Sequence, residues 1–385
     1  MAASDMHPSG FASRSELVTF MMRLRDLISS HDLNGLLECY AENAVMISPV
    51  FGEVKGLEAI ARSWHTIFAN YPDWSVNVTD VLVDGNRVAA LGSNSAIDSS
   101  GWFGLPPTGK SISYRAVILL TFANRKIARD ERLYDLPSLL DRLEKLRIEG
   151  ELRLAAEVQG ALLSRATHIG SHYEAAADSV ACRTIGGDFF ELIDLSSGTF
   201  GMLLGDVAGK GPPAALLAAM LQGGFTAEAQ ITSRPAAALA RMNHALGAKS
   251  LDARFATLVY GLLTPDGHFL YSNAGHNPPF IIGHAGIRRL TVGGPVLGAL
   301  PEAEYLQESV ALDPGDVIVM FSDGVTEAED ALGNEFGEER LVALATAHRG
   351  RPAQEIARAV LRAVSEFTGG KPPADDITVA IAKFQ

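Results

Sequence analysis

Hydrophobic and polar positions alternate with two different periods along this chain, and the change of period divides it into three regions. In the first region, residues 14–135, apolar side chains between positions 17 and 45 recur at helical spacing, with an interruption predicted at Asn34-Gly35. Segments with a two-residue period follow, and the Asp84-Gly85-Asn86 turn signal predicts a hairpin between two of them. Helices followed by antiparallel strands indicate an α+β domain.

The second region, residues 136–168, is rich in Leu, Ala, Glu and Arg and predicts one long helix, with Gly150 and Gly160 as its weak points. Its apolar residues form two series that differ in phase, and the shift lies near Gly150. Such a shift is typical of a stutter in a coiled coil. Two interpretations remain open: a single amphipathic helix packed on its own domain, or a connector that forms a homodimer and transmits a signal.

In the third region, residues 169–385, short apolar runs alternate with Gly and Pro residues and with three helical stretches. Each predicted helix has Pro at or near its start, and the helices cover residues 213–229, 234–249 and 352–367. Two folded units and a connector therefore account for the 385 residues, given a prior of about 150 residues per domain.

Composition narrows the class of protein. Hydrophobic residues make up 47% of the chain and charged residues 20%, which is the balance of a globular protein. The formal charge of −13 disfavours non-specific binding to nucleic acid or to an anionic membrane surface. No segment has the length of apolar sequence that a membrane span needs, and Cys39 and Cys182 have neither a metal-ligand nor a redox spacing. We therefore expect a cytoplasmic protein with no nucleic-acid or membrane partner.

The candidate chemistry lies in GGDFFELIDLSSGTFGMLLGDVAGKG, residues 186–211. Two strand-like runs flank a turn at residues 195–198, with Asp188 at the start of the first run and Asp206 at the end of the second. Both aspartates are nine residues from Ser197, so an antiparallel hairpin would place them opposite each other. Facing carboxylates repel each other unless a cation lies between them.

A second pair of segments repeats this arrangement. GDVIVMFSDG ends in Asp323-Gly324, and ADDITVAIAKF begins with Asp375-Asp376 after its first residue. If these strands run antiparallel, their carboxylates also meet, and we expect the four aspartate sites to share one sheet edge. Clustered carboxylates without His or Cys are typical ligands of Mg²⁺ or Mn²⁺, and two such ions can activate water and clamp a phosphoryl group.

The third region resembles the SpoIIE-type branch of the metal-dependent (PPM) serine/threonine protein phosphatases. The resemblance rests on eight segments in the family's order and spacing: IGGDFFEL, GDVAGKGPPAALLAAM, FATLVYGLL, YSNAGHNPPFII, GGPVLG, DVIVMFSDGVTEAED, GNEFGEERL and DDITVAIAKF. It implies a four-layer α-β-β-α sandwich with a centre of two Mn²⁺ or Mg²⁺ ions between the sheets. It also implies direct attack of water on a phosphoserine or phosphothreonine, without a phosphoenzyme.

The resemblance assigns roles to residues of this chain. The implied catalytic residues are Asp188, Asp206, Asp323 and Asp375. The implied metal ligands are Asp188, Asp206 as the bridging ligand, the Val207 carbonyl, Asp323, and Asp375, with Asp376 as the alternative to Asp375.

Other residues near these aspartates have less certain roles in the resemblance. Arg183 and Gly187 are candidates for binding the substrate phosphate, with a solvated surface arginine as an equal alternative for Arg183. Ala208 replaces a histidine of eukaryotic members, so no side-chain proton donor is predicted there. His276, in AGHNPP, is interpreted as a residue that holds a loop near the site.

The first region resembles a SnoaL-like polyketide cyclase domain in the segments FGEVKGLEAI, FANYPDWSVNV, VDGNRVAALG, GLPPTGKSISY and RDERLYDLPSLLDRL. In this fold a curved antiparallel sheet and helices form a cone around an apolar pocket. The candidate pocket residues are Trp64, His65, Trp74, Trp102, Tyr114 and Asp135, with core packing as the alternative for the aromatic ones. His65 and Asp135 could form an acid/base pair, but a domain joined to a phosphatase by a helix is better interpreted as a sensor.

The leading hypothesis is a protein serine/threonine phosphatase controlled by an N-terminal domain that senses an unidentified small molecule or protein. The resemblance implies a phosphorylated anti-anti-sigma (STAS-domain) protein as the substrate, within partner-switching control of a sigma factor. Two alternatives belong to other classes: a non-catalytic regulator that binds phosphoprotein, and a cyclase or isomerase activity of the first domain.

Overall fold

The computed structural model describes residues 10–385 except 12, 102–104, 163–166 and 248–254. Its contacts divide the chain into two units that meet between Glu151 and Leu152. This boundary lies inside helix α4 (Leu136–Leu162), which accounts for most of the long helix predicted over residues 136–168. Residues 163–166 lie outside the described residues, and Thr167 and His168 belong to a strand, because they pair with the next strand of the chain.

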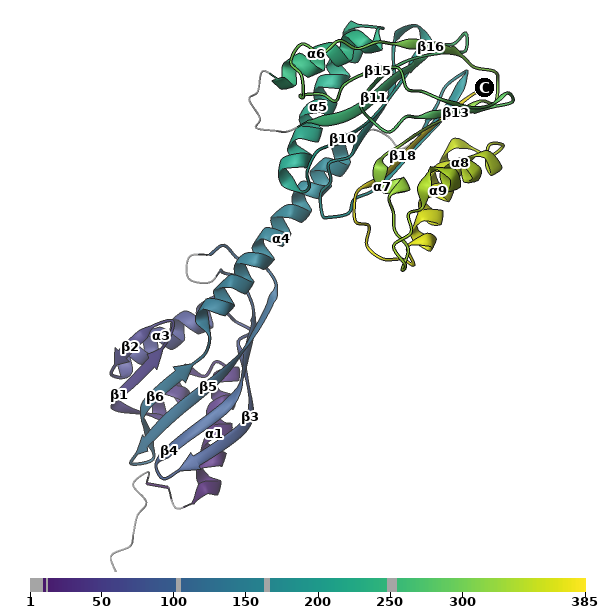
Figure 1. Cartoon of the computed structure of the whole chain (residues 1–385). Coiled ribbons are helices and arrows are strands. Elements are labelled where there is room, and N and C mark those ends of the chain that lie inside the picture. Colours follow the sequence, from purple (N-terminus) through teal and green to yellow (C-terminus); the bar gives the residue numbers. More distant parts are fainter. Residues whose placement is uncertain (1–9, 12, 102–104, 163–166, 248–254) are drawn as a thin grey trace, which may run out of the picture. The chain divides into compact units, whose positions relative to one another are not determined.

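The first unit is built on one six-stranded sheet with helices (Figure 1). The strand order is β2-β1-β6-β5-β4-β3, and every pair is antiparallel except β1 with β6. The strands are β1 (Tyr40–Ser48), β2 (Gly52–Lys55), β3 (Ser75–Asp84), β4 (Arg87–Ile97), β5 (Ser111–Ala123) and β6 (Lys126–Leu133). The helices are α1 (Arg14–Ser29), α2 (Leu33–Glu38) and α3 (Leu57–Asn70). The predicted hairpin between β3 and β4 is confirmed.

Two details of the helical stretch predicted between residues 17 and 45 are wrong. The helices break at His31, whose φ of 58° lies in the left-handed region, and Asp32 then caps α2 by accepting a hydrogen bond from the Gly35 N–H. The Asn34-Gly35 pair therefore lies inside α2. Tyr40–Ser48 is a strand. Its first residue and every second residue from position 44 to position 48 are buried, which fits the two-residue period of a strand.

The second unit contains two six-stranded sheets. One sheet has the order β15-β12-β11-β10-β9 with β16 paired to β12, and the other has the order β14-β13-β17-β18-β8-β7. The first comprises β9 (Phe189–Asp194), β10 (Phe200–Val207), β11 (Ala256–Leu263), β12 (His268–Ala274), β15 (Gly293–Gly294) and β16 (Glu308–Ala311). The second comprises β7 (Thr167–Ile169), β8 (Tyr173–Val180), β13 (Phe280–Gly283), β14 (Gly286–Arg289), β17 (Val317–Phe321) and β18 (Ile377–Phe384).

Helices cover the outer faces of both sheets and complete four layers. The sheets share a core to which Met202 contributes from one side and Ile318 and Ala380 from the other. Helices α5 (Pro212–Ile231) and α6 (Pro235–Gly247) pack on the first sheet. Helices α8 (Gly337–Ala347) and α9 (Ala353–Phe367) pack on the second, near the short helix α7 (Asp323–Thr326). The α-β-β-α sandwich is therefore confirmed.

The three helices predicted for this unit are α5, α6 and α9, whereas α8 was not predicted. Residues 248 and 249, at the end of the second predicted helix, lie outside the described residues. The central strands β10 and β17 are almost entirely buried, which explains why their sequences are runs of apolar residues rather than an alternating pattern.

The two ends of α4 contribute to different units. Leu139 and Leu143 are buried in the core of the first unit. Near the other end, Gln159 exchanges two hydrogen bonds with Gly186: its Nε2 donates to the carbonyl oxygen at 2.8 Å, and its Oε1 accepts from the N–H at 3.2 Å. No helix in the described part of the chain has both the length and the apolar character needed to cross a membrane.

Candidate metal centre

The β9–β10 hairpin sets the first two aspartates opposite each other. Its antiparallel ladder ends with Phe189 opposite Gly205, so the next step in register sets Asp188 against Asp206. A short 3₁₀ turn at Ser196–Gly198 connects the two strands. The hairpin predicted from the equal spacing of the aspartates is therefore confirmed.

The other aspartates lie at the ends of β17 and β18, which pair antiparallel as predicted. Asp323 begins α7 one residue after the end of β17, and Asp375 and Asp376 directly precede β18. The expectation that all four acidic sites share one sheet edge is wrong, because β9 and β10 belong to one sheet and β17 and β18 to the other. The acids meet because the two sheets pack face to face, and the charges of Asp323 and Asp375 both act on Asp206.

Asp188 is a buried carboxylate, with 7% of its surface exposed. Its Oδ2 accepts a hydrogen bond from the Thr378 hydroxyl at 2.5 Å. Burial and then the charge of Asp206 raise the pKa of Asp188 well above its ordinary value, although the Thr378 and Ser322 hydroxyls act in the opposite direction. A carboxyl group with such a pKa lacks sufficient compensating positive charge.

The neighbouring acids are perturbed in the same direction. Burial, together with the charges of Asp323, Asp375 and Asp376, raises the pKa of Asp206 to about 7. Burial and the charge of Asp375 raise the pKa of Asp323. The cluster therefore concentrates negative charge in a place where water cannot screen it well.

Asp375 and Asp376 differ in what their carboxylates contact. Asp376 is 5% exposed, and its two oxygens accept from backbone donors: Oδ1 from the Cys182 N–H at 2.8 Å and Oδ2 from the Gly187 N–H at 2.6 Å. Asp375 is partly exposed, and its Oδ2 pairs with Lys210 Nζ at 2.8 Å. Asp376 thus ties the loop before β9 to the start of β18, whereas the side chain of Asp375 borders the acidic cluster.

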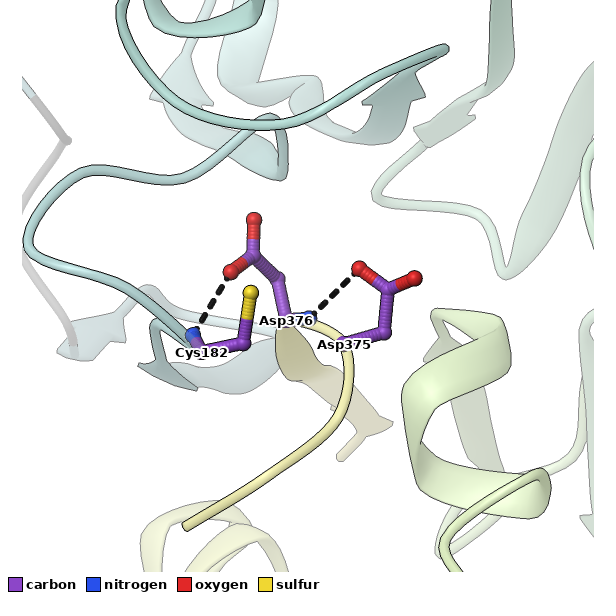
Figure 2. Close-up of side chains that lie close together, drawn as sticks. All are labelled: Cys182, Asp375 and Asp376. Atoms are coloured by element: carbon purple, nitrogen blue, oxygen red, sulfur yellow. Dashed lines mark hydrogen bonds between the residues drawn. The ribbon is translucent and has the colours of Figure 1, made fainter.

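Cys182 lies beside these two aspartates (Figure 2). Its Sγ and one oxygen of each carboxylate are all within 4.8 Å of one another. Burial and the hydrogen bond with Asp376 raise the pKa of the Cys182 thiol to about 11, so the thiol is neutral and a weak metal ligand. Sequence spacing could not show this position, since the pairing of β8 with β18 brings Cys182 to the two aspartates.

Gly187 packs directly against the acidic cluster. A Cβ at this position would lie 2.9 Å from the Val207 carbonyl oxygen and 3.3 Å from Asp206 Oδ1, so a side chain would force the strand ends apart. The Val207 carbonyl therefore lies next to the Asp206 carboxylate, where the resemblance expects a ligand. The N–H of Gly187 is already bonded to Asp376, and its role in binding substrate stays a prediction.

Cationic side chains border the acidic cluster. Lys210 bonds the Ala374 carbonyl at 2.6 Å in addition to Asp375, and Arg183 is exposed, with Nη1 4.0 Å from the Cβ position of Gly211. A cleft of about 500 Å³ opens beside Asp375 and Lys210. The sequence reasoning missed Lys210, although a lysine between glycines shortly after a buried aspartate was a usable signal.

His276 supports the strand next to Asp206. Its Nδ1 shares a hydrogen bond of 2.8 Å with the Thr257 hydroxyl, and Thr257 lies opposite Asp206 in the β10–β11 ladder. Its backbone N–H donates to Asn273 Oδ1 at 2.7 Å. Burial lowers the pKa of His276 to about 4, so the ring is neutral near pH 7 and supplies no charge.

These residues fit a divalent metal centre by their chemistry. The donors that meet here are carboxylates and one backbone carbonyl, which are the oxygen ligands that Mn²⁺ and Mg²⁺ prefer. The Cys182 thiol is neutral, and the His276 ring is neutral and bonds Thr257 through Nδ1. The raised pKa values of Asp188, Asp206 and Asp323 mark a cluster that positive charge would stabilise.

The predicted sensor residues fall into three groups: those that line a cavity, one outside the described residues, and two that do not line the cavity. Trp64, Trp74 and Tyr114 line one cavity of about 270 Å³ in the first unit, while Trp102 lies outside the described residues. Asp135 does not line this cavity: it is exposed and accepts hydrogen bonds from the Ser138 N–H at 3.1 Å and hydroxyl at 2.7 Å, which caps α4. His65 is exposed on α3, so the acid/base pair considered with Asp135 is not present in the cavity.

Comparison with known proteins agrees with the division of the chain into two units. Residues 196–385 match the family model of stage II sporulation protein E (SpoIIE), and residues 22–130 match that of the SnoaL-like domain. The phosphoserine phosphatase RsbU of Bacillus subtilis is 31% identical over 189 residues, which are 48% of this chain and 56% of RsbU. Protein IcfG of Synechocystis sp. is 28% identical over 226 residues, which are 51% of this chain and 36% of IcfG. The chain thus spans between about a third and just over half of these relatives.

Solved structures have the same fold as the second unit. The SiaA-PP2C domain of Pseudomonas aeruginosa aligns with a TM-score of 0.55 and 21% identity, over 63% of this chain and 99% of that domain. The RsbU and RsbW domains of Rv1364c from Mycobacterium tuberculosis align with a TM-score of 0.51 and 22% identity, over 58% of this chain and 63% of that one. At this level of identity the likeness concerns the fold alone.

We expect Asp206 to make the metal-free protein less stable as pH rises. Its folded-state pKa is about 7, whereas an unfolded aspartate titrates near 4, so the folded state binds this proton more tightly. The resulting stabilisation is complete below about pH 4 and is lost as pH rises through about 7. Thermal unfolding in EDTA should show Asp206→Asn gaining stability relative to the parent as pH rises through this window, because the variant has no charge to desolvate.

The comparison with the variant isolates the effect of Asp206, because His276 changes stability with pH in the opposite direction. Its lowered pKa makes the folded state less stable at low pH. Adding Mn²⁺ at the upper end of this range should raise the melting temperature of the parent more than that of Asp206→Asn. A parent and variant with parallel pH profiles in EDTA would contradict the assigned electrostatics.

Proposed function

We propose that this chain, which carries a SpoIIE domain behind a SnoaL-like domain, is a metal-dependent phosphatase that hydrolyses phosphoserine or phosphothreonine on a regulatory protein. The observation that carries the proposal is the cluster of Asp188, which is buried, with the partly buried Asp206, Asp323 and Asp375, at the place where the two sheets meet. Their charges repel one another, and the pKa values of Asp188, Asp206 and Asp323 are raised. The phosphoserine phosphatase RsbU, which matches about half of this chain, supports the same reaction.

The proposed cofactors are two Mn²⁺ or Mg²⁺ ions. The residues that would hold them are Asp188, Asp206, Val207 through its carbonyl, Asp323 and Asp375. Bound ions of this kind lower the pKa of water and clamp a phosphoryl group for in-line displacement. We assign Asp376 a positioning role rather than a ligand role, because both its oxygens already hold backbone N–H groups.

The chain's own residues would orient the reactants. Thr378 fixes the Asp188 carboxylate by a hydrogen bond, and Asp376 fixes the loop on which Asp188 lies. Lys210 places positive charge beside the cluster, where it would attract a phosphate, and Arg183 lies near Gly211 in the loop that follows Asp206. Position 208 is alanine, so the proton for the leaving hydroxyl would come from water in the cleft rather than from a side chain there.

We propose a phosphorylated STAS-domain anti-anti-sigma protein as the substrate, acting in partner-switching control of a sigma factor. The cleft of about 500 Å³ beside Asp375 would receive the phosphorylated side chain of such a protein. The name of RsbU, a phosphoserine phosphatase, supports phosphoserine as the group that is hydrolysed.

A non-catalytic regulator that binds phosphoprotein is the second candidate function. One observation favours it, which is the alanine at position 208 in place of a proton donor. The presence of acids at all the expected strand ends favours catalysis instead, because a binding module has no need to bury mutually repelling carboxylates.

We propose that the N-terminal domain is a ligand sensor and that α4 transmits its control to the metal centre. Gln159 bonds both the N–H and the carbonyl of Gly186, and the adjacent Gly187 N–H holds Asp376. Gln222 of α5 provides a second anchor, since its Nε2 donates to the Leu162 carbonyl at 2.8 Å. A shift of the helix end would therefore move the loop that carries Asp188.

The same helix presents an apolar stripe that we propose as a homodimer contact. Leu154, Val158 and Leu162 follow one another at four-residue spacing, and each has more than half of its surface exposed. Side chains at this spacing form one face of a helix, which is the pattern of a coiled-coil seam.

With Mn²⁺, the purified protein is expected to release phosphate from a phosphorylated STAS-domain anti-anti-sigma protein. Asp206→Asn should reduce the rate to background, because it removes the charge of the proposed bridging ligand. Asp313→Asn, an exposed aspartate outside the cluster, is the matched control and should leave the rate unchanged. Binding of the phosphoprotein without release by the parent would reject hydrolysis and favour the second candidate.

Gln159→Leu is expected to weaken Mn²⁺ binding about fivefold to tenfold, since it removes two hydrogen bonds from Gly186, each worth about 1 kcal/mol at most. Calorimetric titration with Mn²⁺ measures the affinity directly. Glu157→Gln, an exposed neighbour on α4, is the control. Equal Mn²⁺ affinity and equal phosphate release in Gln159→Leu and the parent would contradict the proposed coupling between α4 and the metal centre.

A further inference from the structure

The cleft beside the acidic cluster joins the proposed metal centre to a turn that follows α7. Asp375 is part of the wall of this cleft of about 500 Å³, and so are residues 327–330 and Glu335. Burial and then the charge of Asp323 raise the pKa of Glu327, so the turn lies within electrostatic reach of the centre. A phosphoprotein whose phosphate lies at the centre would therefore fill or cover this cleft.

The 327–336 turn has a defined conformation. Asp330 Oδ1 accepts hydrogen bonds from the Leu332 N–H at 2.7 Å and the Asn334 N–H at 2.9 Å. At the end of the turn Phe336 is buried, and its ring packs edge to face on an aromatic ring of α9, with centroids 5.4 Å apart. The turn therefore presents its outer side chains from a fixed frame.

The cleft carries more negative than positive charge. Five acidic side chains and two lysines line it among the described residues. Lys210 is paired with Asp375. Glu327, Glu329 and Glu335 are exposed, and their carboxylates form no ion pair or hydrogen bond with any residue that the structure describes. These three glutamates therefore give one wall of the cleft a charge that the chain itself does not compensate.

The kind of cation that suits this wall follows from its geometry. Within the described part of the chain, the three glutamates do not form a group whose oxygens all lie within 4.8 Å of one another, so a bound metal ion does not account for them. Lys371, the second lysine of the lining, is exposed and supplies one positive charge against three negative ones. Separate, solvated carboxylates suit the long side chains of arginine or lysine on a partner.

The same surface also offers apolar contacts. Leu332 is 87% exposed, the highest value among the large apolar side chains that the structure describes, and it projects from the fixed 327–336 turn. Val180, Leu361 and Ile377 line the cleft itself. Apolar groups within a charged rim are typical of surfaces that bind another protein. The partner should therefore combine basic side chains with an apolar one.

We infer that the cleft and the 327–336 turn form the docking surface for the substrate, and that this surface selects a phosphorylated segment flanked by arginine or lysine and by an apolar side chain. The basic groups pair with Glu327, Glu329 and Glu335, and the apolar group packs on Leu332. The inference rests on the proposed function, because it names the class of substrate that the same metal centre receives.

Three peptides test this inference on the full chain with saturating Mn²⁺, and fluorescence anisotropy measures their affinities. They are Arg-Leu-Arg-Ala-X-Ala-Arg-Leu-Arg, the same peptide with Glu in place of Arg, and the same peptide with Ala in place of Leu. X is the phosphonate analogue of phosphoserine, in which a methylene group replaces the ester oxygen and prevents hydrolysis. The Arg peptide should bind at least about tenfold more tightly than the Glu peptide. This ratio should shrink between about 50 mM and about 500 mM salt. The Ala peptide should bind about threefold more weakly than the Arg peptide with Leu.

Variants of exposed residues locate the docking surface. Glu329→Gln combined with Glu335→Gln should weaken the Arg peptide at least about threefold without weakening the Glu peptide. Leu332→Ser should abolish the difference between the peptides with Leu and with Ala. The matched control is Glu302→Gln combined with Glu304→Gln, two exposed glutamates outside the lining of the cleft. All these variants should keep the parent's melting temperature and its kcat and KM for p-nitrophenyl phosphate, which has no flanking residues.

The inference is overturned if the Glu peptide binds as tightly as the Arg peptide, if the double glutamate variant keeps the parent's preference for Arg, or if Leu332→Ser keeps the preference for Leu. Phosphoserine peptides of the same sequences separate this inference from the proposed function. No phosphate release from any of them would reject hydrolysis, while the phosphonate affinities would still decide the docking surface. Release with equal kcat/KM from the Arg and Glu peptides would leave hydrolysis standing and overturn the inference.

Discussion

Repulsion among buried carboxylates is the constraint on which the second unit depends. Asp188 and Asp206 face each other across a hairpin, and Asp323 and Asp375 approach them from the other sheet. Each group would be better solvated apart, and burial raises the pKa of three of them. The fold holds them together through strand pairing and core packing.

The same constraint explains the surroundings of the centre. Asp376 uses both oxygens to hold the loop before β9, and Gly187 leaves no side chain between that loop and Asp206. Through Gly186, this loop is also bonded to Gln159 of α4. Gln159 is therefore bonded to a residue two positions before Asp188, and this is the contact through which the proposed control by the first unit would reach the proposed metal centre.

Sequence reasoning reached the parts of this arrangement that depend on local order. Equal spacing from a turn was enough to pair Asp188 with Asp206, because hairpin register follows from the chain itself. Sequence reasoning failed where the contacts of a residue depend on segments far away in the chain. The second acidic pair lies on another sheet, and Cys182 reaches Asp376 only through strand pairing. Asp135 looked like a pocket residue, but the structure uses it as a helix cap, a role that its position before α4 also allows.

The central claim is that the acidic cluster is a centre for two divalent ions rather than a strained feature of the fold. Anomalous scattering at the manganese edge, from crystals of the full chain grown with Mn²⁺, tests it most directly. The account predicts two peaks per chain, bridged by Asp206 and bounded by Asp188, Asp323 and Asp375, with Asp376 still bonded to the Cys182 and Gly187 N–H groups. An empty cluster at saturating Mn²⁺, or a peak coordinated by Asp376 and Cys182 instead, would contradict it.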